Sequence, residues 1–279
     1  MLAPALAVAY GILLCAVLPV LAWQSKRKLD QGLRIPRMAL YAEALVLQFL
    51  LLGLTWGVAR ANGLPLVDVP DLSSGDLLLG IAVLGIALGA ALVGWRRAGE
   101  ASKDRLRMML PATTAERVVW VAVSLTAGIS EEVAFRGLLP TLIQRWSGSI
   151  VLAVVISVIA FSLSHLLQGW SSALFVGFFA AVFHGVVIVT GSLWIAIAIH
   201  VLYDLIAGVM LQRIVADRPS GDGAGASHLL LIQAGGVQRV LARQPAENRR
   251  LRGRVARAHG WAARRRLPHC GISFLPEKS

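Results

Sequence analysis

The sequence predicts an all-α membrane protein, a polytopic bundle of about seven transmembrane helices, with six to eight as the range. The first observation is composition: of 279 residues, 57% are hydrophobic and 15% are charged, whereas a soluble domain carries about 25% charged residues. The second is a series of apolar runs, each long enough to cross a bilayer. The third is the alternation of basic and acidic loops between those runs.

Seven runs approach the roughly 20 apolar residues that a helix needs to cross the hydrocarbon core. Backbone polar groups in lipid must pair within their own segment, so each run is expected to be helical. The expected spans are Leu2–Trp23, Ala39–Ala59, Leu77–Trp95, Val118–Leu139, Ile150–Gln168, Ser172–Val189 and Ser192–Leu211.

The loops predict the orientation. The loops after the first and third spans are basic, whereas the loop after the second holds Arg60 against Asp68, Asp71 and Asp76. Positive loops stay in the cytoplasm, so the N-terminus is expected outside. Seven spans then place the C-terminal tail in the cytoplasm. The expected location of the protein is the inner or plasma membrane of the cell.

The net charge of +12 is concentrated in the tail. Residues 213–279 hold 13 Lys/Arg and 4 Asp/Glu, a difference of +9. A basic tail can bind nucleic acid, but after a membrane domain it more often marks the cytoplasmic side. The predicted organisation is therefore N-terminal transmembrane helices in 1–110, a transmembrane core in 111–212 and a basic, poorly ordered cytoplasmic tail in 213–279. The expected partner is the bilayer and not nucleic acid.

Ionisable residues within three of the expected spans are candidates for function, because a charge in the membrane is costly. The fourth span holds Glu131 and Glu132, followed four residues later by Arg136. That spacing puts Glu132 and Arg136 on one helix face as a possible ion pair, and turns Glu131 by about 100° to point elsewhere.

The fifth and last spans hold the other two groups. Phe161 lies one turn before His165, where it can shield the imidazole from lipid. His200 and Asp204 are also four residues apart, so that the carboxylate can orient the ring. Each pattern alone has a structural explanation, as a packed histidine or a helix end at the interface; all three together favour a chemical site.

Taken in order, Glu-Glu-x-x-x-Arg, Phe-x-x-x-His and His-x-x-x-Asp resemble the motifs of the CPBP family of intramembrane proteases. That family includes the CAAX prenyl endopeptidases of the Rce1 type and the Abi group linked to bacteriocin processing and immunity. The resemblance covers about Val118 to Met210. It implies an intramembrane endopeptidase that hydrolyses a peptide bond of a membrane-associated or lipid-modified substrate.

The resemblance also implies roles. Glu131 would activate the attacking water and His165 would hold it, while His200 and Asp204 would stabilise the oxyanion. Where the family has Asn in place of Asp204, an ionised Asp cannot donate a hydrogen bond; Asp204 would have to be protonated, orient His200 or bind a metal. Glu131, His165 and His200 could alternatively ligate zinc, and the metal-free glutamate mechanism is slightly preferred.

Two alternatives stay open: a non-catalytic scaffold or immunity protein on the same fold, and a proton-coupled transporter that uses the same side chains as a relay. The span assignment also carries a difficulty. It places Glu131 and His165 more than about 10 Å apart in depth, so convergence requires a bend at Gly128, Gly137 or Pro140, or a different position of the fourth span.

Overall fold

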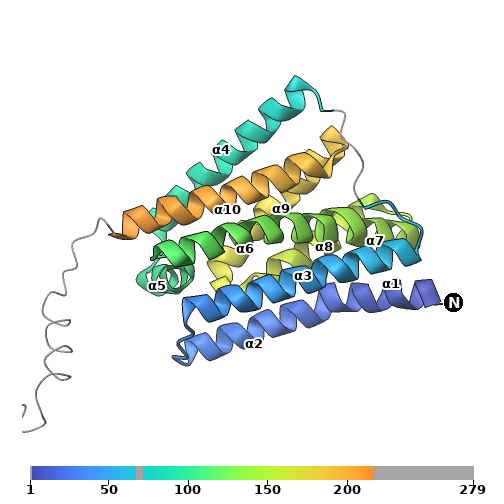
Figure 1. The fold of residues 1–279 in the computed structure, drawn as a ribbon. Coiled ribbons are helices and arrows are strands. Elements are labelled where there is room, and N and C mark those ends of the chain that lie inside the picture. The colour runs from blue at the N-terminus through green and yellow to red at the C-terminus, as the bar shows by residue number, and fades with distance from the viewer. Residues whose placement is uncertain (1, 67–71, 217–279) are drawn as a thin grey trace, which may run out of the picture. The chain divides into compact units, whose positions relative to one another are not determined.

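The computed structural model describes residues 2–66 and 72–216, so nearly all of the expected tail, beyond residue 216, lies outside the described residues. Within these ranges the chain is helical and contains no strand, which confirms the all-α prediction (Figure 1). Six helical runs are long and apolar enough to cross a membrane. A seventh apolar helix has 15 residues, about 22 Å of rise against a hydrocarbon core of about 30 Å.

Each expected span has a helical counterpart. The helices, with two π-helical turns and one 3₁₀ turn, are α1 (Leu2–Ile12), η1 (Leu13–Val17), α2 (Leu18–Asp30), α3 (Arg37–Ala61), α4 (Ser74–Arg97), α5 (Glu100–Met109), α6 (Thr114–Glu132), η2 (Val133–Leu138), α7 (Leu139–Ser147), α8 (Ile150–Ser164), η3 (Leu166–Gln168), α9 (Trp170–Thr190) and α10 (Leu193–Ala216). The basic segment between the third and fourth spans contains the short charged helix α5.

The outward surface of the bundle is apolar, as a lipid solvent allows. Leu78, Ile81, Val118 and Val151 are each 66–70% exposed. In water such a surface would be an aggregation site. These side chains identify the faces of α4, α6 and α8 that lipid covers.

The fourth span differs from its expected bounds, and the difference removes the depth problem. It extends from Thr114 to Ser147 instead of Val118 to Leu139, so that Glu131 lies in its middle. Gly148 then adopts a left-handed conformation with φ of 70°, and α8 runs back along α7. Counted from this turn, Glu131 lies 16 residues before Ser147 and His165 lies 15 residues after Ile150. At 1.5 Å per residue these are distances of about 24 and 22 Å, which match.

The π-helical turn η2 directly follows the acidic pair and explains how Pro140 fits inside this helix. Proline has no N–H and its ring crowds the carbonyl one turn earlier, so it distorts a regular α-helix. Here the Ser157 hydroxyl of α8 donates to the Phe135 carbonyl. That contact satisfies a backbone acceptor within the π turn, as lipid requires. The same arrangement of π turn and proline recurs at η1 and Pro19.

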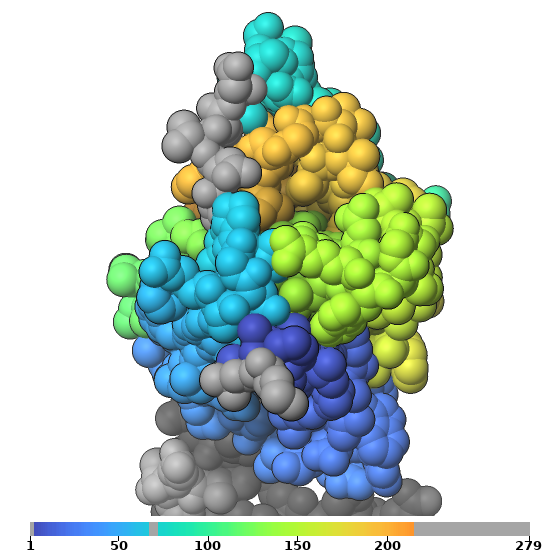
Figure 2. Space-filling view, turned by 90° about the vertical axis from the view of Figure 1, so that its right-hand side faces the viewer, coloured from blue at the N-terminus to red at the C-terminus, as the bar shows by residue number. Residues whose placement is uncertain are grey.

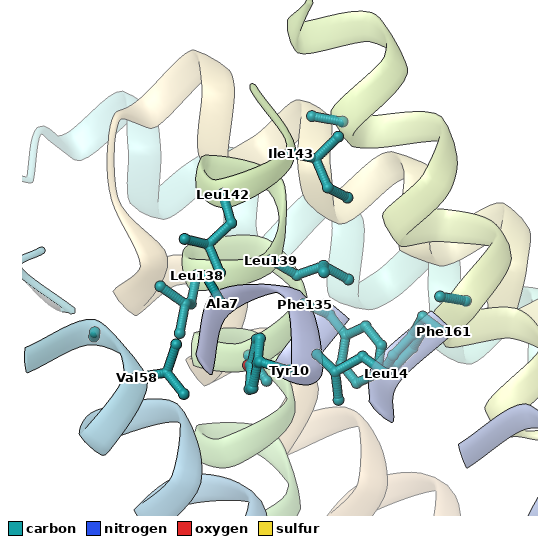
Figure 3. Packing of buried hydrophobic residues seen from close by; sticks show 14 of the residues in the cluster. Ala7, Tyr10, Leu14, Val58, Phe135, Leu138, Leu139, Leu142, Ile143 and Phe161 are labelled. Carbon is teal, nitrogen blue, oxygen red and sulfur yellow. The ribbon is translucent and has the colours of Figure 1, made fainter. Parts of the chain in front are cut away.

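A buried apolar cluster joins α1, α3, α7 and α8 around these turns (Figure 3). Tyr10, Leu14 and Leu139 are fully buried in it. Its polar contact is between α1 and α3: the Tyr10 hydroxyl lies 2.9 Å from Thr55 Oγ1, and Thr55 donates to the Leu51 carbonyl at 2.7 Å. The ends of α1, α3 and α7 are packed side by side on the face shown in Figure 2.

The basic loops meet at the other end of the bundle, around α5. Arg105 of α5 pairs with Asp30 at the end of α2, with Nη2 2.5 Å from Oδ1. The Tyr41 hydroxyl donates to the Met109 carbonyl at 2.8 Å, and Arg37 Nη2 donates to the Arg107 carbonyl at 3.2 Å. These contacts hold α5 against the ends of α2 and α3. The two loops expected on the same side of the membrane therefore lie together.

Candidate active site

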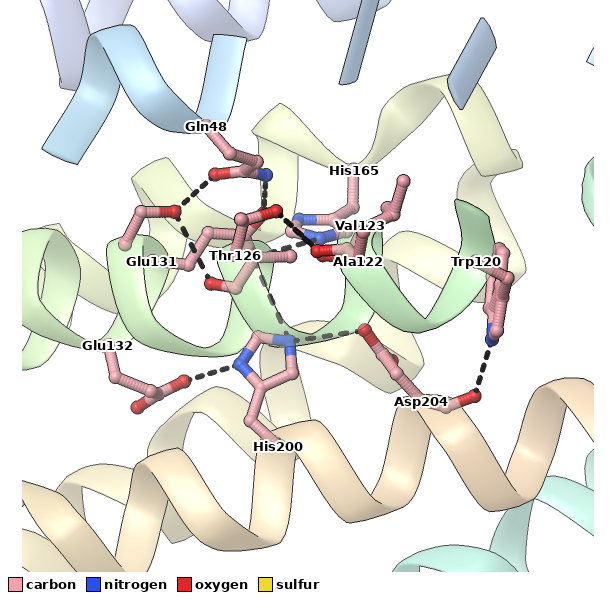
Figure 4. A network of polar contacts seen from close by, with 12 residues as sticks. Gln48, Trp120, Ala122, Val123, Thr126, Glu131, Glu132, His165, His200 and Asp204 are labelled. Carbon is pink, nitrogen blue, oxygen red and sulfur yellow. Dashed lines mark hydrogen bonds and ion pairs between the residues drawn. The ribbon is translucent and has the colours of Figure 1, made fainter. Parts of the chain in front are cut away.

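Glu131 of α6 lies between the two histidines that the sequence singles out. Its Oε2 is 3.7 Å from His165 Nε2 and 3.9 Å from His200 Nε2 (Figure 4). Oε2 is buried and accepts no hydrogen bond from the described residues. Both separations are too long for direct hydrogen bonds but within reach of one bridging water. Three helices thus bring one carboxylate oxygen and two imidazole nitrogens around a single small volume.

His165 ends α8, and its own helix fixes its tautomer. Its Nδ1 is 2.9 Å from the carbonyl oxygen of Phe161. A carbonyl only accepts, so Nδ1 carries the proton. In the neutral ring Nε2 is then an acceptor, and it faces Glu131. The expected shielding by Phe161 is also present, since the two ring centroids are 4.5 Å apart.

His200 of α10 is held by Glu132 more closely than by Asp204, contrary to the expectation from spacing. Its Nδ1 donates to Glu132 Oε1 at 2.7 Å, whereas Asp204 Oδ2 lies 3.8 Å from Nε2. Glu132 reaches His200 because α6 and α10 pack closely at Gly128, where an added Cβ would lie 2.5 Å from Val201 Cγ2. Asp204 lies near the ring because it is one turn further along α10, and at 3.8 Å it makes no hydrogen bond to Nε2.

The expected ion pair between Glu132 and Arg136 is present. Arg136 Nη1 lies 3.1 Å from Glu132 Oε1, and these side chains are 2% and 0% exposed. The guanidinium also stacks on aromatic rings, 4.1 Å from the centroid of Phe161 and 5.5 Å from that of Phe183. A buried charge needs such partners. Arg136 therefore compensates Glu132, which in turn orients His200.

Two polar residues that sequence reasoning missed complete the network. Gln48 of α3 donates from Nε2 to Glu131 Oε1 at 2.6 Å. Its own Oε1 accepts from the Ser130 hydroxyl at 2.5 Å. The available signal was a single glutamine within the otherwise apolar stretch Leu45–Leu54. An uncharged amide is a weaker sequence indicator of a buried site than a carboxylate, although in lipid it too needs hydrogen-bond partners.

A cavity of about 470 Å³ adjoins this network. Gln48, Glu131, His165, His200 and Asp204 all line it. From there it extends between α3 and α4 toward α5, where its walls are apolar or small. The residues along this part are Leu40, Tyr41, Ala44, Ala87, Ala91, Gly94, Trp95, Leu106 and Met109. The cavity therefore extends from the polar cluster toward the end of the bundle that bears the basic loops.

Glu131, His165 and His200 are the three side chains that could ligate zinc at this site. Both Nδ1 atoms have acceptors, a carboxylate for His200 and a carbonyl for His165, as ligating histidines usually do. However, tetrahedral zinc with ligands at 2.0–2.2 Å sets its ligand atoms about 3.4 Å apart, and the observed separations are 3.7 and 3.9 Å. Within the described residues, no group of three His, Cys, Asp or Glu is placed to hold a metal ion. As arranged, the side chains do not fit tetrahedral zinc.

The fold and this geometry define a class: a polytopic membrane protein whose helices enclose a carboxylate–imidazole cluster. The family comparison agrees with that class. Residues 113–206 match the Rce1-like family, described as type II CAAX prenyl endopeptidase Rce1-like. This match covers α6 to the first part of α10 and agrees with the resemblance that the motifs indicated. No curated protein and no solved structure is significantly similar to the chain.

Proposed function

We propose that this protein is an intramembrane endopeptidase that hydrolyses a peptide bond of a membrane-associated substrate, of the CAAX type or a related precursor. The observation that supports it most is the position of Glu131 Oε2 within 3.9 Å of both imidazole Nε2 atoms. The Rce1-like match of residues 113–206 independently supports a protease.

In the proposed mechanism Glu131 is the general base. A water between Glu131 Oε2 and the Nε2 atoms of His165 and His200 loses a proton to Oε2 as its oxygen attacks the substrate carbonyl. The proton on Glu131 then passes to the leaving amine. We propose this metal-free route because the ligand atoms are spread more widely than tetrahedral zinc requires.

His165 orients the water. Its Nδ1–H donates to the Phe161 carbonyl, so the lone pair of Nε2 accepts a hydrogen bond from the water. The water then has one hydrogen directed at His165 and the other at Glu131. A lone pair of its oxygen is left for the attack.

His200 stabilises the oxyanion that develops in the tetrahedral intermediate. Glu132, beside Nδ1 at 2.7 Å, and Asp204, 3.8 Å from Nε2, both favour the protonated imidazole. Its Nε2–H can then donate to the oxyanion. In this scheme Asp204 acts on the charge of His200 and does not itself donate a hydrogen bond.

The test is cleavage of a peptide with a C-terminal prenylated cysteine motif, in liposomes that contain the purified protein. Release of the C-terminal fragment by the wild type, and its loss in Glu131→Ala, His165→Ala and His200→Ala, is the expected result. Glu43→Ala removes an exposed carboxylate of α3 and should leave cleavage unchanged. Folded wild-type protein that cleaves no such peptide would favour a non-catalytic role. Proton-dependent uptake that is lost in Glu131→Ala would favour a transporter.

A further inference from the structure

Gln48 is the feature of the site that the Rce1-like match does not cover. It lies on α3 (Arg37–Ala61), whereas the match spans residues 113–206. It lines the cavity and makes the shortest contact that Glu131 has, 2.6 Å from Nε2 to Oε1. A helix outside the matched domain therefore contributes directly to the environment of the proposed base.

The orientation of the Gln48 amide follows from its two partners. Ser130 Oγ donates to Gln48 Oε1 at 2.5 Å, and this leaves Nε2 to donate to the carboxylate. If the amide were turned over, Gln48 Oε1 would face Glu131 Oε1, and two acceptors would repel each other. The carboxylate thus decides the orientation of the amide, and the Ser130 hydroxyl, which can donate or accept, pairs with the end that faces it. Ser130 is itself buried, 1% exposed, so water does not compete for its hydroxyl.

This contact distinguishes the two oxygens of Glu131. Oε1 is occupied by the Gln48 amide, while Oε2 accepts no hydrogen bond from the described residues and faces both imidazoles. A proton arriving on Oε1 would remove negative charge from the oxygen that accepts the Gln48 Nε2–H hydrogen bond and would weaken that bond. A proton arriving on Oε2 leaves the bond in place. The amide therefore directs proton transfer to the oxygen that lies nearest the histidines.

We propose that Gln48 is a positioning residue of this site, which fixes the Glu131 carboxylate through Oε1 so that Oε2 accepts the proton of the attacking water. This inference rests on the proposed function. Gln48 acts on the chemical step through Glu131, so its loss should lower kcat and leave KM little changed.

The test compares Gln48→Leu, Ser130→Ala and the double variant in the liposome cleavage assay, with rates expressed per folded protein. Leucine has a similar size and removes both polar ends. Loss of a hydrogen bond to a charged group predicts a fall in kcat of about 10- to 100-fold for Gln48→Leu. Ser130→Ala, which frees only the far end of the amide, should cause a smaller fall. In the Gln48→Leu background Ser130→Ala should add nothing, because the residue through which it acts is gone. Gln144→Leu, the same change at an exposed position of α7, should behave as the wild type.

Several results would overturn the inference. Wild-type kcat in Gln48→Leu would show that the amide does not position the base. A raised KM with unchanged kcat would assign Gln48 to substrate binding instead. Additive losses in the double variant would show that Ser130 does not act through Gln48. If the wild type cleaves and Glu131→Ala does not, any of these results removes only the role of Gln48; a wild type without cleavage removes the proposed function as well.

Discussion

The buried pair of Glu132 and Arg136 offers a quantitative test of how the site is held together. Both side chains are almost completely inaccessible, and Glu132 Oε1 lies 3.1 Å from Arg136 Nη1 and 2.7 Å from His200 Nδ1. Removing one partner of a buried pair leaves an uncompensated charge and costs about 3–5 kcal/mol. We expect Glu132→Gln and Arg136→Met each to lower the free energy of unfolding by this amount, which is a large part of the roughly 5–15 kcal/mol typical of folded domains.

The double variant should cost much less than the sum of the two. With neither charge present no charge is left unpaired, and the amide oxygen of the new Gln can still accept the hydrogen bond from His200 Nδ1–H. A double-mutant cycle by SDS-titrated unfolding in mixed micelles, followed by tryptophan fluorescence, measures the coupling. Asp104→Asn, at the more exposed pair with Arg107 on α5, is the matched control and should change little. Additivity of the two site substitutions within about 0.5 kcal/mol would refute the reasoning, because it would mean that the charges are not coupled.

Three further expectations concern packing and chemistry. Gly128→Ala should lower the free energy of unfolding by about 1–3 kcal/mol and slow cleavage, because the new Cβ would lie 2.5 Å from Val201 Cγ2 and push α10 away from Glu132. Gly89→Ala, whose Cβ would meet nothing within 4 Å, is the control. Equal unfolding temperatures for the two variants would contradict the close packing at Gly128. Thr55→Val should cost about 1 kcal/mol in the same unfolding assay by removing the buried contact with Tyr10, and an unchanged value would show that this hydrogen bond adds nothing. Cleavage should persist after dialysis against EDTA and 1,10-phenanthroline, with elemental analysis to check for zinc; activity lost on chelation and restored by zinc would replace the metal-free route.

The helical architecture could be predicted because a segment surrounded by lipid has an apolar composition of its own. Lipid requires long apolar runs and internally paired backbones, so each span can be identified from its own sequence without knowledge of the others. The ion pair of Glu132 with Arg136 and the packing of Phe161 on His165 were also predictable, since each joins residues four apart on one helix. Such spacing fixes the shared face whatever the tertiary structure.

Contacts between helices could not be predicted in the same way. The spacing of His200 and Asp204 suggested a carboxylate partner on the same helix, yet Glu132 of α6 takes Nδ1 because Gly128 lets the helices approach closely. The fourth span was placed too short, because Pro140 and the polar pair Gln144 and Arg145 follow Leu139, although the helix continues to Ser147. Gln48 lies 83 residues from Glu131, and the sequence around neither residue indicates that the two are in contact.

The most direct measurement is the single-turnover rate of peptide cleavage by Glu131→Gln, compared with wild type at saturating enzyme in liposomes. Glutamine keeps the size of the side chain but cannot serve as a base. The account predicts a fall in rate of about 100-fold or more, with binding of the peptide retained. Cleavage at the wild-type rate would contradict it, because the carboxylate between the two imidazoles would then have no part in activating water.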